Sequence, residues 1–258
     1  MARTAGRLAN KVIIVTGAAK GIGNAIARCV SREGATVVLT DIDGERARDA
    51  VVLLGDGCIF MELDVADQGR FDSVAAETLT RFGRIDGLVN NAGINVKYEP
   101  LAMPDAEWHR CLNINLKGQW NGCRAVLPTM VRQQAGAIVN ISSVHGHQIV
   151  PASFPYPVSK SAILGLTRAL GVEYAPNNIR VNSISPGYVD TDLLQDYFNS
   201  LPDPDSARRS TDELIPARRV CRPDEVGMTT VFLLSDEAPY IAGSDIVIDG
   251  GRLAMYHN

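Results

Sequence analysis

Short apolar runs alternate with longer stretches of helical spacing along almost the whole chain. The apolar runs cover residues 12–15, 36–40, 58–63, 85–89, 137–141, 179–184 and 245–248. Between them, apolar residues recur at helical intervals over about 21–33, 43–54, 68–82, 105–134, 156–174 and 223–234. Nearly continuous apolar strands, each followed by a helix, are typical of a parallel sheet covered on both faces. Because crossovers between parallel strands are right-handed, the pattern predicts an α/β fold with a doubly wound sheet of about seven strands.

One stretch interrupts this alternation. Residues 190–220 are polar and contain Pro202, Pro204 and Pro216, which predicts a mobile excursion from the sheet. We expect this excursion, over about 190–220, to form a lid over a substrate. No linker rich in proline and serine divides the 258 residues, so we expect a single domain over residues 1–258.

Charge and cysteine usage narrow the possible partners and compartment. The formal net charge is −4 and no basic stripe stands out, which argues against nucleic acid or an anionic membrane as partner. The five cysteines contain no C-x-x-C pair, which fits a reducing compartment better than a disulfide framework. The first apolar run has four residues, too few for a signal-peptide core or a membrane span. We therefore expect a soluble, cytoplasmic protein without a membrane partner.

The turn after the first strand has the composition of a phosphate-binding loop. It reads TGAAKGIG from Thr16 to Gly23 and leads directly into a helix. Gly17, Gly21 and Gly23 permit a tight turn and a close approach of backbone to ligand, and the helix N-terminus favours a pyrophosphate. The spacing departs from G-x-G-x-x-G, and Lys20 is not followed by the serine or threonine of a nucleotide-triphosphate loop. A plain strand-to-helix turn remains the alternative.

The end of the second strand bears on the choice of dinucleotide. Asp41 stands there, about twenty residues after the glycine turn. A carboxylate at this place accepts hydrogen bonds from an adenosine ribose and repels a 2′-phosphate, which favours NAD. Lys20 could meet a 2′-phosphate, so NADP stays possible. The alternative reading of Asp41 is a helix cap.

Tyr156 and Lys160 stand four residues apart, a spacing that places both side chains on one face of a helix. Pro157 follows the tyrosine directly, and proline is tolerated only in the first turn of a helix. The sequence therefore predicts that the helix begins within about three residues before Pro157. Alone, this pair would read as an amphipathic surface pair. Ser143, thirteen residues upstream at a strand end, favours a catalytic set instead.

An ordered series of motifs resembles the short-chain dehydrogenase/reductase family, whose fold is the Rossmann fold. The series consists of TGAAKGIG at 16–23, Asp64-Val65, NNAG at 90–93, Asn115 in NINLKG, NISS ending at Ser143, Tyr156-x-x-x-Lys160, RVNSISPG at 180–187 and DGG at 249–251. The resemblance covers about residues 8–251. It implies an NAD(P)-dependent oxidoreductase that interconverts a secondary alcohol and a ketone, or a sugar hemiacetal and a lactone. It also implies a homotetramer.

The resemblance assigns a role to each matching residue. The implied catalytic residues are Ser143, Tyr156, Lys160 and Asn115. The implied cofactor contacts are Gly17, Lys20, Gly21, Ile22, Gly23, Asp41, Asp64, Val65, Asn91, Ala92, Gly93, Tyr156, Lys160, Pro186, Gly187, Val189 and Thr191. Among these, Asp64 and Val65 are similar to adenine contacts, while Val189 and Thr191 are similar to nicotinamide contacts.

The chemistry explains why a tyrosine would need a lysine here. A free tyrosine has a pKa near 10, too high for a base at neutral pH. We expect the ammonium group of Lys160 and an oxidised nicotinamide to lower it, so that Tyr156 takes a proton from a substrate hydroxyl as hydride leaves the same carbon. Ser143 would hold the substrate oxygen, and Asn115 would organise a water beside Lys160. Pro157 departs from the small residue that most relatives carry.

The substrate is less clear from the sequence. His145, His147 and Gln148 follow Ser143, and we expect them to line the substrate mouth. The stretch is similar to that of sugar dehydrogenases in the family, which indicates a sugar or polyol, and Tyr256 near the end of the chain adds to this. A 3-oxoacyl thioester reductase is the alternative, although that reaction normally uses NADPH. A catalytically silent dinucleotide-binding sensor or scaffold is a further one. The two histidines lack a third ligand, so we expect no metal.

Overall fold

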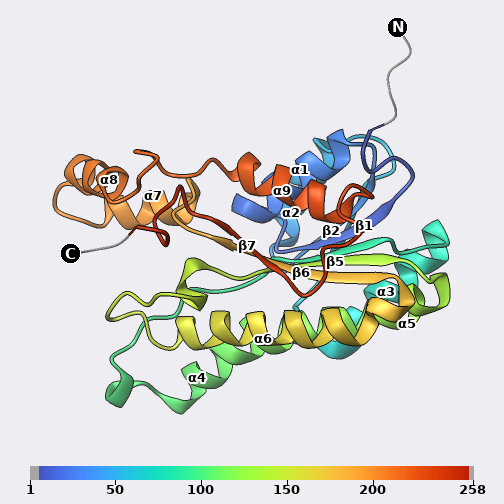
Figure 1. The fold of residues 1–258 in the computed structure, drawn as a ribbon, viewed down its shortest axis with the longest axis horizontal. Helices are drawn as coiled ribbons and strands as arrows, with labels where there is room; N and C mark the ends of the chain where they lie inside the picture. The colour runs from blue at the N-terminus through green and yellow to red at the C-terminus, as the bar shows by residue number, and fades with distance from the viewer. Residues whose placement is uncertain (1–5, 256–258) are drawn as a thin grey trace, which may run out of the picture.

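The computed structural model describes residues 6–255 and forms one parallel sheet of seven strands (Figure 1). The strands are β1 (Val12–Thr16), β2 (Thr36–Asp41), β3 (Ile59–Glu62), β4 (Gly87–Asn90), β5 (Gly136–Ile141), β6 (Ile179–Pro186) and β7 (Asp245–Ile248). Their order in the sheet is β3-β2-β1-β4-β5-β6-β7, and every neighbouring pair is parallel. The predicted doubly wound α/β sheet is confirmed. Tyr256 lies outside the described residues.

Helices cover both faces of the sheet. They are α1 (Gly21–Arg32), α2 (Gly44–Val52), α3 (Gln68–Phe82), α4 (Asp105–Leu112), α5 (Gly118–Gln133), α6 (Tyr156–Tyr174), α7 (Asp192–Asn199), α8 (Pro204–Glu213) and α9 (Pro223–Leu234). Short turns form η1 (Pro100–Ala102), η2 (Asn113–Lys117), η3 (Val144–Gly146) and η4 (Ala175–Asn177). One core cluster packs α1, α2 and α9 on one face, and a second packs α3, α5 and α6 on the other.

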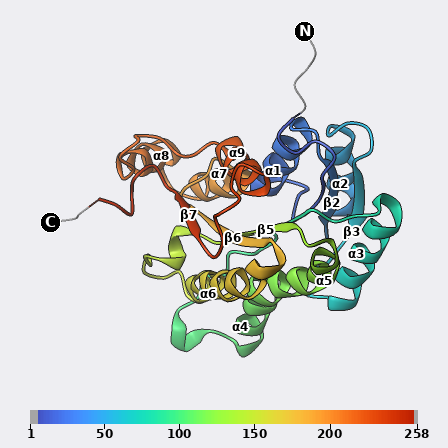
Figure 2. The same ribbon diagram turned by 45° about the vertical axis from the view of Figure 1, so that its right-hand side comes forward.

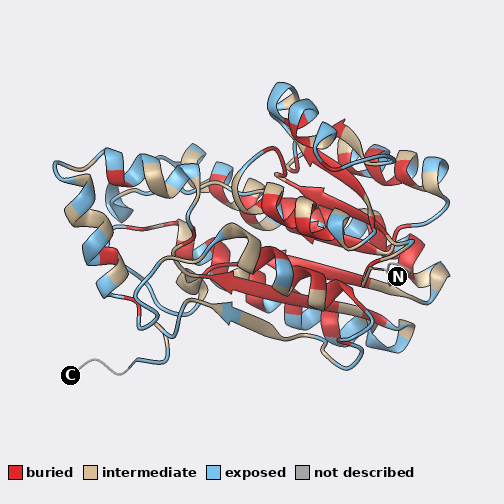
Figure 3. Ribbon diagram, turned by 90° about the horizontal axis from the view of Figure 1, so that it is seen from above, coloured by how far each residue is buried: buried red, intermediate tan, exposed pale blue. Residues whose placement is uncertain are grey.

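The strands are hydrophobic on both faces because helices cover both sides of the sheet. All five residues of β1 are buried, and the central strands lie almost entirely in the buried part of the molecule (Figure 3). Exposed residues concentrate on the outward faces of the helices. Parallel strands place their carboxyl ends at one edge of the sheet, so the polar residues that follow β1, β2, β4 and β5 come together there. None of the helices within residues 6–255 is long and apolar enough to cross a membrane.

The long helical region predicted over 105–134 contains a π-helical turn. Helix α4 passes through η2, which is a π-helix, into α5 without a loop. Asn115 lies in this turn and is buried. Such turns inside α-helices occur most often at functional sites, because the extra residue redirects a side chain. This turn aims Asn115 at the loop after β4, as described below.

Helix α6 begins where the prolines place it. Pro155 is its N-cap and Tyr156 is its first residue, with Pro157 in the first turn. The prediction of a start within about three residues before Pro157 is confirmed. Proline is accepted in the first turn because the N–H groups there have no carbonyl partner within the helix.

Most of the stretch from 190 to 220, predicted as an excursion from the sheet, is helical. Helices α7 and α8 form a pair that extends beyond the sheet (Figure 2). Phe198 and Ile215 anchor the pair and are almost completely buried. Pro202 and Pro216 lie outside the helices, and Pro204 is the first residue of α8, where Asp203 caps the amide of Ser206.

Candidate active site

The glycine turn after β1 lies against the loop after β4. Gly17 and Gly21 adopt positive φ angles of 63° and 58°, which favour glycine. A Cβ on Gly23 would lie 2.2 Å from the Gly17 carbonyl oxygen and 2.4 Å from Asn91 Nδ2. Asn91 Nδ2 donates to the carbonyls of Thr16 and Gly17, at 3.0 Å each. This amide therefore fixes the turn in the shape that only glycine permits.

The N-terminus of α1 is open to an anion. Lys20 is the N-cap and no side chain caps this end, and the first turn carries no acidic residue. Thr191, the N-cap of α7, approaches from the other side, with its Cγ2 3.6 Å from where a Cβ on Gly21 would stand. Amide donors, a helix N-terminus and glycines without side chains together fit the pyrophosphate of a dinucleotide.

Asp41 reaches the same turn from the end of β2. Its Oδ2 accepts the amide of Ala19 at 2.9 Å and its Oδ1 accepts the amide of Asp43 at 3.0 Å. The carboxylate is therefore held beside the glycine turn, with lone pairs remaining for ribose hydroxyls.

Asp64 and Val65 follow β3. Asp64 is exposed, whereas Val65 is buried and its carbonyl accepts Asn121 Nδ2 at 2.9 Å.

Two further strand ends complete this edge. Asn91 and Ala92 both donate their amides to Thr16 Oγ1, at 3.0 and 3.1 Å, so the loop after β4 is bonded to the end of β1. At the other side, β6 ends at Pro186, and a Cβ on Gly187 would lie 3.0 Å from the Cβ of Asp249. Val189 forms an isolated bridge with Cys221 at the base of the α7–α8 pair. The structure thus brings the predicted cofactor residues to one edge of the sheet.

Tyr156 and Lys160 lie on the first turns of α6, beside the end of β5. The Nζ atom of Lys160 is 5.4 Å from the centroid of the Tyr156 ring and donates to the Ile141 carbonyl at 2.9 Å. Lys160 is buried, with 4% of its surface exposed. Ser143 is also buried, and its hydroxyl accepts the amide of His145 at 3.1 Å. The three side chains predicted from the sequence therefore come together.

Burial governs how these groups ionise in the protein alone. It raises the pKa of Tyr156 to about 12, although a hydrogen bond with the Ser143 hydroxyl acts in the opposite direction. Burial also lowers the pKa of Lys160 to about 8, because an ammonium group is poorly solvated here. At neutral pH the phenol is thus protonated and most of the lysine is charged. The protein by itself does not produce the acidic phenol expected from the sequence.

Asn115 supports this arrangement through a chain of hydrogen bonds. Its Oδ1 accepts the amide of Ile94 at 2.8 Å and its Nδ2 donates to the Ile94 carbonyl at 2.9 Å. The same Nδ2 donates to Ser159 Oγ at 3.1 Å, and that hydroxyl donates to the Tyr156 carbonyl at 2.7 Å. Asn115 therefore links the loop after β4 to the first turn of α6. Sequence reasoning did not single out Ser159.

Comparisons with known proteins show the family to which the chain is similar. Residues 17–252 match the family model described as enoyl-(acyl carrier protein) reductase. The chain is 42% identical over 251 residues to the oxidoreductase UcpA of Salmonella typhimurium, covering 95% of each protein. It is 38% identical over 249 residues to the 3-oxoacyl-[acyl-carrier-protein] reductase FabG of Thermotoga maritima, covering 95% of this chain and 98% of that protein. A solved short-chain dehydrogenase/reductase structure from Burkholderia xenovorans matches with a TM-score of 0.93 and 34% identity, covering 98% of this chain and all of the other.

The chain belongs to the short-chain dehydrogenase/reductase family. It is an oxidoreductase of the class that acts on alcohols and ketones, it takes a small-molecule substrate, and its Rossmann-like sheet binds a nicotinamide dinucleotide.

The two histidines after Ser143 point in different directions. The His145 ring meets the Tyr156 ring edge to face, with centroids 5.7 Å apart. Burial, with smaller effects of the charges on Lys97 and Arg252, lowers the pKa of His145, so the ring is neutral at pH 7. His147 instead bonds the Asp245 carboxylate at the start of β7, at 2.8 Å, and Gln148 is exposed. Of the two histidines, His145 is the one that lies beside Tyr156.

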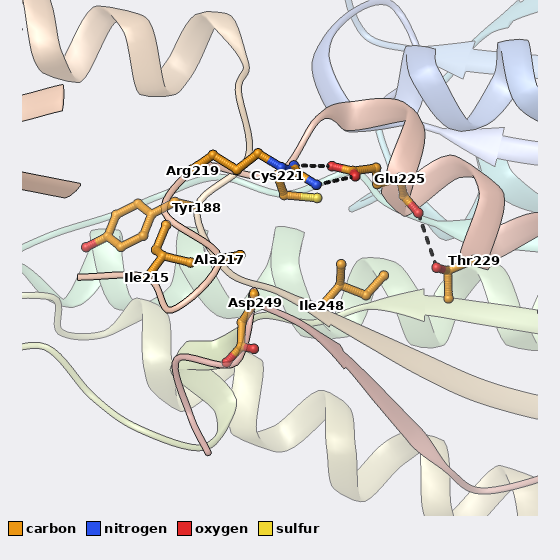
Figure 4. A pocket seen from close by; sticks show the side chains of 10 residues that line it. Tyr188, Ile215, Ala217, Arg219, Cys221, Glu225, Thr229, Ile248 and Asp249 are labelled. Carbon is orange, nitrogen blue, oxygen red and sulfur yellow. Dashed lines mark hydrogen bonds and ion pairs between the residues drawn. The ribbon is translucent and has the colours of Figure 1, made fainter. Parts of the chain in front are cut away.

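Sequence reasoning missed Tyr188, which follows the Pro186-Gly187 turn. It lines a cavity of about 260 Å³ beyond the ends of β6 and β7, together with Ile248 and Asp249 (Figure 4). Arg219 and Glu225 form an ion pair at this cavity, with contacts of 2.7 Å. Its lining does not include the three residues predicted as catalytic, Ser143, Tyr156 and Lys160. The position after Pro-Gly at a strand end was the signal that could have found Tyr188.

Proposed function

We propose that this protein exchanges a proton between Tyr156 and the oxygen of a secondary alcohol or ketone, with NAD as its dinucleotide. The observation that carries the proposal is the convergence of Tyr156, Lys160 and Ser143 at the end of β5. When bound, the dinucleotide supplies the hydride donor or acceptor and, in its oxidised form, a positive charge that favours the phenolate.

Each residue of the set has a distinct part. Tyr156 is protonated at neutral pH, so the phenol is ready to donate a proton to a ketone oxygen and to recover it in the reverse direction. The Ser143 hydroxyl holds the substrate oxygen by a hydrogen bond. Lys160 places its positive charge beside the phenol ring and favours the phenolate as it forms. Asn115 fixes the backbone of this turn through Ser159.

The choice of NAD rests on Asp41. Its carboxylate is oriented by two amide donors beside the glycine turn, where it would accept ribose hydroxyls and repel a 2′-phosphate. Lys20 is exposed on the same turn and keeps NADP as the alternative. Initial rates with each dinucleotide at equal concentration decide between them.

We favour a sugar or polyol as the substrate. The neutral His145 ring beside Tyr156 offers a hydrogen-bonding group to a hydroxylated carbon chain, and its Nδ1 is buried without a hydrogen-bond partner among residues 6–255. A 3-oxoacyl thioester is the second candidate, supported by the relative from Thermotoga maritima. Turnover of NAD with sugars and alditols, compared with NADPH and acetoacetyl thioesters, separates the two.

A catalytically silent sensor is the alternative of a different class, and Tyr156→Phe separates it from an enzyme. The variant keeps the ring and loses the transferable proton. We expect turnover to fall by about a hundredfold or more while dinucleotide binding stays within about twofold. Turnover equal to that of the wild type would show that Tyr156 is not the proton donor.

Three further features extend the proposal. The α7–α8 pair is the substrate lid, since Thr191 at its start approaches the glycine turn and Tyr197 stands over Lys97. The family resemblance supports a homotetramer, which sedimentation velocity would test. The cysteines Cys29, Cys58, Cys111, Cys123 and Cys221 are all free thiols, which supports a cytoplasmic location.

A further inference from the structure

The backbone of Lys97 lies beside the N-terminus of α6, where Tyr156 stands. It forms an isolated antiparallel bridge with Pro155, the residue before Tyr156. The neighbouring amide of Tyr98 donates to the Phe154 carbonyl at 2.7 Å. Lys97 is exposed, and its Nζ lies 5.5 Å from the centroid of the Tyr197 ring on α7. The loop after β4 therefore carries a cation between the catalytic turn and the proposed lid.

Arg252 brings a second cation from the far end of the chain. Its guanidinium lies 5.5 Å from the centroid of the Tyr188 ring, which belongs to the turn after β6. Its Nη1 is buried and has no hydrogen-bond partner among residues 6–255. A buried guanidinium donor without an acceptor destabilises the folded protein, so we expect a ligand to supply the acceptor here.

The two cations act on the same side chain. The charged groups that shift the pKa of His145 are Lys97 and Arg252, and both are positive. The His145 ring in turn touches the Tyr156 ring. Within the described residues, neither cation has a carboxylate within 4.0 Å, and the nearby Asp249 carboxylate accepts the amides of Gly251 and Leu253. His145, whose ring contacts Tyr156, therefore lies near two positive charges that have no carboxylate partner within the described residues.

We propose that the substrate carries a carboxylate, and that Lys97 and Arg252 bind it while His145 contacts the hydroxylated part of the molecule. The substrate class is a hydroxy acid or its keto acid. This inference rests on the proposed function and specifies its substrate. Guanidinium and ammonium groups are the usual partners of carboxylates. Helix α7 of the proposed lid would close over Lys97 and Arg252 through Tyr197.

The test uses matched pairs of probes that differ in charge. The pairs are gluconate with glucitol, and 3-hydroxybutanoate with its methyl ester, each assayed with NAD. We expect the acid to exceed its neutral counterpart in kcat/KM by about tenfold or more. Arg252→Met and Lys97→Met should each lower this acid-to-neutral ratio by about tenfold, mainly through KM, and Arg252→Lys should keep much of it. Arg132→Met is the matched control, since Arg132 is exposed at the end of α5 and bonds Thr129.

Each outcome decides a different point. An unchanged ratio in both Met variants, or equal rates for acid and neutral probes, overturns the carboxylate site and leaves the proposed function standing. A rise in the KM for NAD without a change of ratio assigns the cations to the cofactor and also overturns the inference. If no probe is oxidised, calorimetric titration of gluconate and glucitol decides. Binding of gluconate alone, lost in Arg252→Met, supports the carboxylate site while the proposed function fails, and equal binding overturns the site.

Discussion

Substituting Gly23 by alanine tests whether the glycine turn is the dinucleotide site. The new Cβ would lie 2.2 Å from the Gly17 carbonyl oxygen, 2.4 Å from Asn91 Nδ2 and 2.9 Å from the Gly17 carbonyl carbon. Ordinary contacts of this kind are 3.4 Å or longer. The helix α1 and the turn must therefore separate by about 1 Å at this point. Neither contact can yield cheaply, because one is backbone and the other is a hydrogen-bonded amide.

The magnitude follows from what that separation breaks. The two bonds from Asn91 Nδ2 to Thr16 and Gly17 are each 3.0 Å long, and each contributes about 1 kcal/mol to the free energy of unfolding. Overpacking adds about 1–3 kcal/mol. We expect Gly23→Ala to lower the free energy of unfolding by about 3–5 kcal/mol, a large part of the stability of an ordinary domain. Because the amides at the N-terminus of α1 move with the helix, dinucleotide affinity should fall by about a hundredfold.

Gly165→Ala is the matched control for this experiment. Gly165 lies in α6, and a Cβ there would meet nothing within 4 Å. Alanine should stabilise the helix by about 0.5–1 kcal/mol and leave dinucleotide affinity unchanged. Urea unfolding gives the stability of both variants, and titration with NADH monitored by fluorescence gives the affinity. If Gly23→Ala bound NADH within about twofold of the wild type, the glycine turn would not be the pyrophosphate site.

Three other predictions address the charge of Lys160, the role of Asp41 in the choice of dinucleotide, and the orientation of the two histidines. Burial holds the pKa of Lys160 at about 8, below its usual 10.5, so the unfolded chain binds more protons between these values and native stability rises with pH. Between pH 7.5 and 9.5, the free energy of unfolding of the wild type, measured with urea, should rise by about 2 kcal/mol relative to that of Lys160→Met. A difference between the two proteins that does not change with pH would contradict the burial of the lysine. Asp41→Ala should lower the ratio of kcat/KM for NAD over NADP by about tenfold, and an unchanged ratio would remove the basis for NAD. His147→Ala should leave the KM of the best sugar or hydroxy-acid substrate within about twofold, since His147 bonds Asp245. His145→Ala should raise this KM by about fivefold. Equal effects of the two substitutions would place both rings in the site.

Local sequence rules predicted the elements well where one strong signal acted. Pro155 and Pro157 located the start of α6 because a missing N–H is harmless only in the first turn. For residues 190–220 the sequence predicts only a polar, mobile excursion, although most of that stretch is helical. Pro204 in fact begins α8, and the buried face of the α7–α8 pair could not be seen in a stretch so rich in polar residues.

The ionisation of the site required the fold. From the sequence, the four-residue spacing of Tyr156 and Lys160 indicated an ammonium group that lowers the tyrosine pKa. In the structure the ammonium group donates to the Ile141 carbonyl, and the pKa of Tyr156 rises to about 12. Burial depends on what packs around a residue, and most of that comes from distant parts of the chain.

The sequence by itself determined the parallel sheet, the glycine turn and the face of α6 that carries Tyr156 and Lys160. Each follows from local spacing and from the limits that glycine and proline place on the backbone. The tertiary structure alone decided that His145 faces Tyr156 while His147 turns to Asp245. It also decided that the charges of Lys97 and Arg252, 155 positions apart, both lower the pKa of His145. Strand ends meet at one edge of a parallel sheet whatever their separation along the chain. Which side chains converge there depends on packing between segments that no local pattern connects.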